Sequence, residues 1–157
     1  MVIDGVALDG WTGTSREFLG AHPRGAYTTA RTVKHGAAVF ELDAHIDRTA
    51  ESLRLMHGAA LDAALEPAAF REQFVGTMAA ALRCFYAQGN DTALEARVTV
   101  LAAWEDDTLR FFCHASQLPP PPPSPVIVEV RGSPRSTAAA KVSWRRSAHV
   151  ATLPFQH

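Results

Sequence analysis

Lys141 is the residue of this sequence whose type and surroundings best suit covalent chemistry. It stands in an apolar run, 138–142, and Arg135 and Arg145 are close in sequence. A lysine amine attacks a carbonyl group only in its neutral form, and burial beside other cations lowers the pKa of a lysine. Lys141 could therefore bind an aldehyde covalently. The residues alone leave open a second interpretation, in which Lys141 is a solvated lysine of a basic segment.

Arg31 is the second candidate, because a guanidinium group can bind a phosphate. Its planar fork matches two phosphate oxygens and stays charged over the relevant pH range. Arg31 belongs to a segment, 27–33, that begins with an aromatic residue and predicts a strand. The alternative is that Arg31 is a polar residue on the outer face of that strand.

Metal and nucleotide chemistry have less support in the sequence. Cys84, Cys113 and His114 lack the compact spacing of a zinc site, and Cys84 falls within a predicted helix. The sequence has no Gly-rich phosphate loop of the Rossmann or P-loop type. We therefore predict no metal site.

The elements that must position Lys141 and Arg31 can be read from the spacing of apolar residues. Residues 1–25 are predicted to be irregular, and a hairpin of strands 27–33 and 37–42 follows. Two helices come next, one from the N-cap Asp43 to about His57 and one from about Pro67 to Gly89. Strands 94–100 and 109–114, joined by a turn at 105–108, complete the order. The second helix carries an apolar stripe at i, i+4 spacing. This order predicts an α+β domain, with an antiparallel sheet packed on two helices.

A proline-rich segment divides the chain. Residues 118–125 contain six prolines in eight positions and predict an extended, semi-rigid linker, with an SH3-type ligand as the alternative. We expect a small α+β domain at 1–117, a linker at 118–125 and an incomplete second domain at 126–157.

Composition and charge bound the function classes. The chain has 157 residues, 47 % of them apolar and 20 % charged, and a net charge of −1. These values suit one folded domain and do not by themselves call for nucleic acid. No apolar run approaches a membrane span, the amino terminus lacks a leader pattern, and the two cysteines suggest no disulfide framework. We expect a cytoplasmic protein with no membrane or nucleic-acid partner.

Four segments, in the same order, resemble the pattern of class-IV pyridoxal-phosphate aminotransferases. Residues 25–31 are similar to the strand motif G-x-[YF]-x-x-x-R, and residues 39–52 to the hairpin and the helix opening H-[IL]-x-R-[LI]-x-x-S. Residues 96–100 resemble the R-x-x-V strand, and residues 134–144 the stretch around the cofactor-binding lysine, especially in plant-type members. Trp144 follows Lys141 by three residues, where plant-type members are expected to have four. The resemblance covers about 25–150.

The resemblance implies the small domain of fold-type IV and pyridoxal 5'-phosphate bound between two domains. Lys141 would be the catalytic lysine and Arg31, 141 − 31 = 110 residues earlier, the phosphate ligand. Arg97 would lie near the substrate carboxylate, although a surface partner of an acid fits it equally well. Tyr27 would line the substrate pocket, although an aromatic residue at a strand start also suits the core. His45 and Arg48 belong to the motif and are expected to serve the fold.

The activity implied is transamination between an amino acid, of branched-chain or D type, and a 2-oxo acid. No acidic residue follows Lys141, whereas the family takes an acid and further phosphate donors from its carboxy domain. We therefore expect a fragment or an inactive form. Alternatives are a non-catalytic module that pairs with a full-length paralogue or with a second copy, an aminodeoxychorismate-lyase-like enzyme, and, more weakly, a nucleic-acid binder acting through its basic segment.

Overall fold

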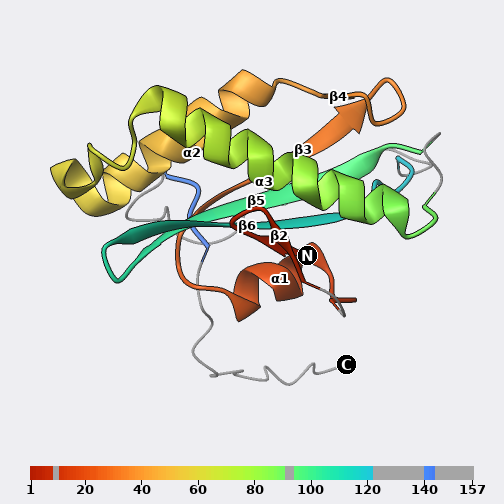
Figure 1. Ribbon diagram of the computed structural model, residues 1–157, viewed down its shortest axis with the longest axis horizontal. Helices are drawn as coiled ribbons and strands as arrows, with labels where there is room; N and C mark the ends of the chain where they lie inside the picture. Colours follow the sequence, from red (N-terminus) through yellow and green to blue (C-terminus); the bar gives the residue numbers. More distant parts are fainter. Residues whose placement is uncertain (9–10, 91–93, 122–139, 144–157) are drawn as a thin grey trace, which may run out of the picture.

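The chain folds around one antiparallel sheet, whose strands differ in length, and helices cover both of its faces (Figure 1). The structure is a computed structural model that describes residues 1–8, 11–90, 94–121 and 140–143. The strand order is β2-β1-β6-β5-β3-β4. The strands are β1 (Val2–Ile3), β2 (Val6–Ala7), β3 (Ala26–Val33), β4 (Ala38–Val39), β5 (Ala96–Glu105) and β6 (Thr108–Gln117). The helices are α1 (Ser15–Ala21), α2 (Leu42–His57) and α3 (Pro67–Ala87), with a short 3-10 turn at Gly58–Leu61. The predicted α+β class is confirmed.

The predicted hairpin is present as β3 and β4. Its turn places Lys34, His35 and Gly36 at positive φ, a conformation that favours glycine. The carboxylate of Glu95 stabilises this turn, because it accepts hydrogen bonds from the backbone N–H groups of His35 and Gly36 and from the hydroxyl of Thr32. β4 is shorter than predicted, since the chain turns into α2 directly after it.

Helix α2 lies where it was predicted, but its N-cap is different. The cap is Glu41, in the left-handed region with φ 50°, and its side chain makes no capping hydrogen bond to the free N–H groups of the helix. Asp43 lies inside the first turn, where its carboxylate pairs with Arg71 of α3. The prediction of Asp43 as the cap is therefore wrong. Gly58 ends the helix at φ 65°, a conformation that favours glycine.

Helix α3 presents the predicted apolar stripe to the sheet. Its first free N–H groups are capped by the side chain of Glu66, directly before Pro67. The stripe packs over β5 and β6 in the larger of two hydrophobic clusters. Its buried members include Phe70, Phe74, Met78 and Phe85.

The prediction that residues 1–25 are irregular is wrong. β1 and β2 form a small hairpin around Asp4 and Gly5, and β1 adds to the sheet beside β6. Helix α1 follows, with a reciprocal capping box between Thr14 and Glu17. It covers the sheet face opposite α2 and α3 (Figure 1), through Phe18.

Because α1 covers the second face of the sheet, the central strand β5 is buried on both faces where α1 lies over it. β5 extends beyond the predicted strand 94–100 to Glu105, and Leu101 and Ala103 in this extension are buried under Phe18 of α1. Farther from α1, the same face of the sheet carries the polar residues Thr99 and Arg97 of β5. Of the predicted linker and second domain, only 118–121 and 140–143 fall within the described residues. No helix in the described part of the chain is long and apolar enough to cross a bilayer.

Candidate functional site

Residues 140–143 lie along the free edge of β3 (Figure 1, blue). The backbone N–H of Tyr27 donates to the carbonyl of Lys141 at 2.9 Å, and the N–H of Ser143 donates to the carbonyl of Gly25 at 2.8 Å. These bonds flank an antiparallel bridge between Ala26 and Val142. Lys141 is therefore opposite Tyr27, and directly opposed residues of antiparallel strands share one face.

The side chain of Lys141 is half-buried against an aromatic ring. Its Nζ lies 4.9 Å from the centroid of the Tyr27 ring, within the range of a cation–π contact. Burial, and next the positive charge of Arg48, lower the pKa of the Lys141 amine below its ordinary value. The environment thus raises the fraction of neutral, nucleophilic amine at a given pH.

Arg48 lies on α2, which packs on the face of β3 that carries Thr28, opposite the face of Tyr27. Its guanidinium donates to the hydroxyl of Thr28 on β3 at 2.5 Å and lies 2.9 Å from Nδ1 of His45. The Thr28 hydroxyl is 2.6 Å from the same imidazole nitrogen. Burial, followed by the charges of Arg48 and Lys141, lowers the pKa of His45, while Glu41 opposes the shift.

Sequence reasoning assigned His45 and Arg48 to the fold alone. The structure places both within electrostatic range of the Lys141 amine. Their spacing of three residues puts them on one face of a helix, which the sequence shows. The sequence does not show which strand this helix face packs against. In the structure it packs against β3, and this packing brings Arg48 towards Lys141.

Arg31 shares a sheet face with Tyr27 but lies farther along β3. The two are four residues apart, which corresponds to about 13 Å along a strand. Arg31 is exposed, and its guanidinium carbon lies 5.5 Å from the ring centroid of Phe40. Arg48, rather than Arg31, is the arginine whose charge acts on the amine of Lys141.

Arg97 is in register with Arg31 across β3 and β5, so both side chains project from the same face. One terminal nitrogen of Arg97 donates to the hydroxyl of Ser116 at 3.4 Å. Its Nε is buried and has no hydrogen-bond partner within the described residues. Buried polar groups normally have partners, so this nitrogen is suited to an acceptor such as a carboxylate or phosphate.

The predicted site residues therefore form two pairs on one sheet face. Lys141 contacts Tyr27 at the start of β3, and Arg31 faces Arg97 near its end. Thr29 of β3 and Thr99 of β5, whose hydroxyls are 3.4 Å apart, lie between the pairs. This face could bind an elongated ligand with a carbonyl group at one end and an anion at the other.

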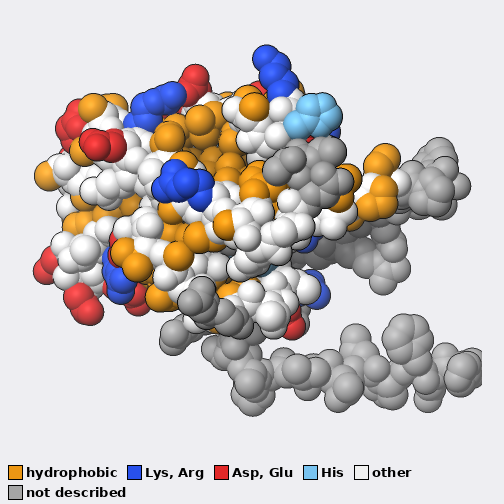
Figure 2. Space-filling view, turned by 45° about the vertical axis from the view of Figure 1, so that its right-hand side comes forward, with side chains coloured by type: hydrophobic (Ala, Val, Ile, Leu, Met, Phe, Trp, Pro, Cys, Tyr) orange, Lys and Arg blue, Asp and Glu red, His pale blue; other side chains and the backbone are white. Residues whose placement is uncertain are grey.

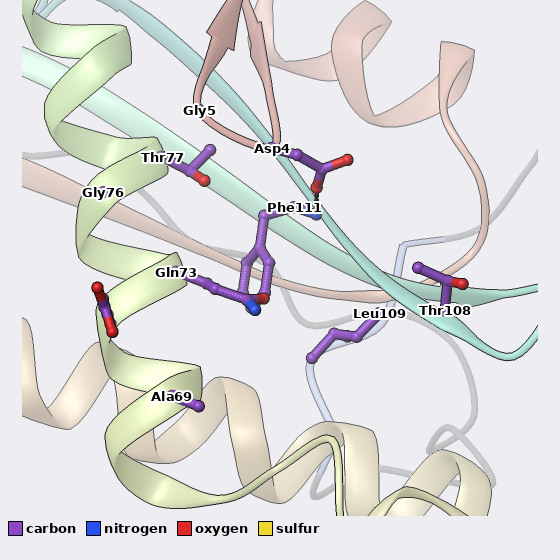
Figure 3. Close-up of a pocket in the computed structure, with 10 residues that line it drawn as sticks. Asp4, Gly5, Ala69, Gln73, Gly76, Thr77, Thr108, Leu109 and Phe111 are labelled. Carbon is purple, nitrogen blue, oxygen red and sulfur yellow. Dashed lines mark hydrogen bonds between the residues drawn. The ribbon is translucent and has the colours of Figure 1, made fainter.

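A separate pocket of ≈ 630 Å³ lies on the side of the sheet that α2 and α3 cover, between α3 and the β1–β2 turn (Figure 3). Gln73 and Thr77 of α3 and Leu109 and Phe111 of β6 are among its lining residues. The carboxylate of Asp4, at its rim, is already bound by Arg110 and by the backbone N–H of Phe111. The pocket contains none of the predicted site residues.

Within the part of the chain that the structure describes, neither Cys113 nor the potential metal ligands form a site. Cys113 is fully buried, and burial raises the pKa of its thiol, so it is not a ready nucleophile. The described ranges contain no group of three His, Cys, Asp or Glu residues placed to hold a metal ion. On the face shown in Figure 2, charged side chains of both signs are interspersed among hydrophobic ones.

The chain was also compared with known proteins. No family model, no curated protein and no solved structure matches it.

Proposed function

We propose that this chain carries part of a pyridoxal 5'-phosphate site of the class-IV aminotransferase type. The observation that carries the proposal is the Lys141 amine, half-buried on the Tyr27 ring with Arg48 close enough to lower its pKa. This is the environment in which a lysine reacts with an aldehyde near neutral pH. The sequence resemblance supplies the identity of the aldehyde, and the α+β fold is compatible with the small domain of that family.

The residues present fit an aldehyde that carries a phosphate. Lys141 offers the amine, and the ring of Tyr27 packs against that amine and excludes water from one side of it. Arg31, which lies on the same sheet face as Tyr27, is the phosphate ligand that the resemblance implies, and Arg48, whose charge acts on the Lys141 amine, is the alternative. Bound pyridoxal phosphate would supply an electron sink for the α-carbon of an amino acid.

Arg97 is the proposed ligand of the substrate carboxylate. Its buried Nε lacks a partner within the described residues, while Ser116 orients one terminal nitrogen. A carboxylate bound there would complete the hydrogen bonds of the guanidinium group. The proposed reaction is transamination of a branched-chain or D-amino acid with a 2-oxo acid.

The proposal is tested by titrating the purified chain with pyridoxal phosphate and recording the visible absorbance of the lysine-bound form. The chain has only two lysines, Lys34 and Lys141, so the experiment has a matched control. Lys141→Arg should abolish the band, and Lys34→Arg, which removes an exposed amine, should leave it unchanged. A band that persists in Lys141→Arg, or is absent from the unaltered chain, contradicts the proposal.

A second candidate function is a non-catalytic module that pairs with a second copy or with a paralogue. The observation that favours it is the edge strand β2, where Val6 is 64 % exposed and Leu8 follows it as a second exposed apolar side chain. An exposed apolar edge is suited to pairing with another strand. Val6→Lys should convert an oligomer to a monomer in analytical ultracentrifugation, and a wild-type monomer at all concentrations counts against pairing with a second copy. Co-purification with a full-length aminotransferase that Val6→Lys abolishes would support pairing with a paralogue.

A further inference from the structure

The hydroxyl of Ser52 joins α2 to the backbone of Lys141. It accepts a hydrogen bond from the N–H of Lys141 at 3.1 Å and donates one to the carbonyl of Arg48, one turn earlier in α2, at 2.8 Å. Ser52 is 1 % exposed, so water does not compete for these bonds. The residue that supplies the amine is thereby attached, through one side chain, to the helical turn that carries Arg48.

Lys141 is consequently held from two elements. Its carbonyl accepts from the N–H of Tyr27 on β3, while its N–H donates to Ser52 on α2. A shift of the lysine backbone away from the sheet would break a hydrogen bond to one element or the other. Breaking the bond to Ser52 would also leave a buried acceptor without its donor, which is the costly outcome.

We propose that Ser52 is a positioning residue for Lys141, fixing its backbone so that the amine stays over the Tyr27 ring and within range of the Arg48 charge. The inference rests on the proposed role of Lys141 as the reacting amine. It adds Ser52, which acts through the backbone of Lys141 and does not itself react. Loosening the contact would let the amine move towards solvent. The amine would then titrate more like an ordinary lysine, because both burial and proximity to Arg48 would decrease.

Thr49 offers a matched control on the same helix. It is also 1 % exposed, and its hydroxyl also donates to the carbonyl four residues earlier, that of His45, at 2.7 Å. It has no hydrogen bond to the 140–143 segment among those of the described residues. Thr49→Ala and Ser52→Ala therefore remove similar hydroxyls from α2, and only Ser52→Ala removes an acceptor of the Lys141 N–H.

The test uses two measurements that do not require pyridoxal phosphate. The first is amide hydrogen exchange at Lys141, which should be roughly tenfold faster in Ser52→Ala, the effect of losing one buried hydrogen bond. The second is the pH profile of Lys141 acetylation, with exposed Lys34 as the internal reference. Ser52→Ala should shift the Lys141 profile to higher pH, and Thr49→Ala and the hydroxyl-retaining Ser52→Thr should leave it in place.

Superposable acetylation profiles for Ser52→Ala and the unaltered chain would overturn the inference. So would free exchange of the Lys141 amide in the unaltered chain, a result that does not depend on any variant folding. A shifted profile combined with a failure to bind pyridoxal phosphate would uphold the positioning role and reject the proposed function, so the two outcomes are distinguishable.

Discussion

Arg31 and Arg97 lie directly opposite each other on β3 and β5, with both guanidinium groups on one face of the sheet. Like charges opposite each other in a sheet are destabilising, by about 0.2–1 kcal/mol in typical pairs. An anion bound between them would offset this cost. We predict that inorganic phosphate raises the melting temperature of the chain more than chloride does at matched ionic strength.

The same measurement on Arg97→Met identifies the cause. This variant removes one charge and the unpartnered Nε while keeping an unbranched apolar stem, so its free energy of unfolding in chloride should be unchanged or about 1 kcal/mol higher. Its response to phosphate should disappear. An undiminished phosphate effect in Arg97→Met would show that the anion binds elsewhere.

Arg31 and Arg48 make different predictions about the phosphate group of the cofactor. Pyridoxal has the aldehyde and lacks the phosphate, so the change in the ratio of its dissociation constant to that of pyridoxal phosphate, from the unaltered chain to a variant, measures phosphate recognition. The internal hemiacetal that free pyridoxal forms cancels in this comparison. Loss of a charge-assisted hydrogen bond costs about 1.5–3 kcal/mol, or roughly 10- to 100-fold in affinity. The sequence predicts that Arg31→Gln collapses this ratio, whereas proximity to Lys141 favours Arg48→Gln.

Fluorescence titration of both variants with both aldehydes decides between the two arginines. Arg48→Gln also removes the bonds to Thr28 and His45, so its unfolding free energy must be measured alongside. A ratio unchanged in both variants would contradict phosphate binding by either residue.

The imidazole of His45 makes stability depend on pH. Its folded-state pKa is lowered by burial, by Arg48 and by Lys141, against the opposing charge of Glu41. The unfolded chain therefore binds the proton more readily, and stability rises with pH between the folded pKa and the unfolded value of about 6.5. Below that window the destabilisation is fully present.

His45→Gln should flatten the stability profile between about pH 5 and pH 7, the range around the ordinary histidine pKa. Urea unfolding at a series of pH values measures the slope. His114, whose pKa is also lowered by burial, is the internal comparison, and His114→Gln should remove only its own share of the slope. A slope that His45→Gln leaves intact would assign the whole pH dependence to other groups.

Gly25 is required where β3 begins, because a Cβ at this position would lie 2.2 Å from the carbonyl oxygen of Ala102. Backbone atoms cannot yield easily, so Gly25→Ala should lower the free energy of unfolding by about 1–3 kcal/mol or more. Gly76, in α3, is the control, since a Cβ there meets nothing within 4 Å. Gly76→Ala should raise stability by about 0.5–1 kcal/mol, because alanine is the better helix former. Equal effects in thermal unfolding would contradict this packing.

Local periodicity was sufficient to predict the main elements. The β3–β4 hairpin follows from its turn residues, and α3 follows from the spacing of Phe70, Phe74 and Met78. The N-terminal hairpin was missed because each strand has only two residues, although Asp4-Gly5 is a favoured hairpin turn. Helix α1 was also missed, despite the capping-box spacing of Thr14 and Glu17.

The site could be predicted only residue by residue. Residue type and motif order selected Lys141, Arg31, Arg97 and Tyr27, which the structure places on one sheet face. The contacts that define their environment join residues far apart in sequence, such as Ser52 with Lys141 and Arg31 with Arg97. These contacts depend on strand register and helix packing, which no local pattern specifies.

The most direct test of the proposed site is to locate the bond between the chain and its aldehyde. The chain is incubated with pyridoxal phosphate, reduced with borohydride to fix the adduct, digested and mapped by mass spectrometry. Lys141, the amine with the lowered pKa, should carry the adduct at substoichiometric concentrations of pyridoxal phosphate, with Lys34 and the amino terminus largely unmodified. Labelling spread over Lys34, Lys141 and the amino terminus in proportion to exposure would contradict a pyridoxal phosphate site at Lys141.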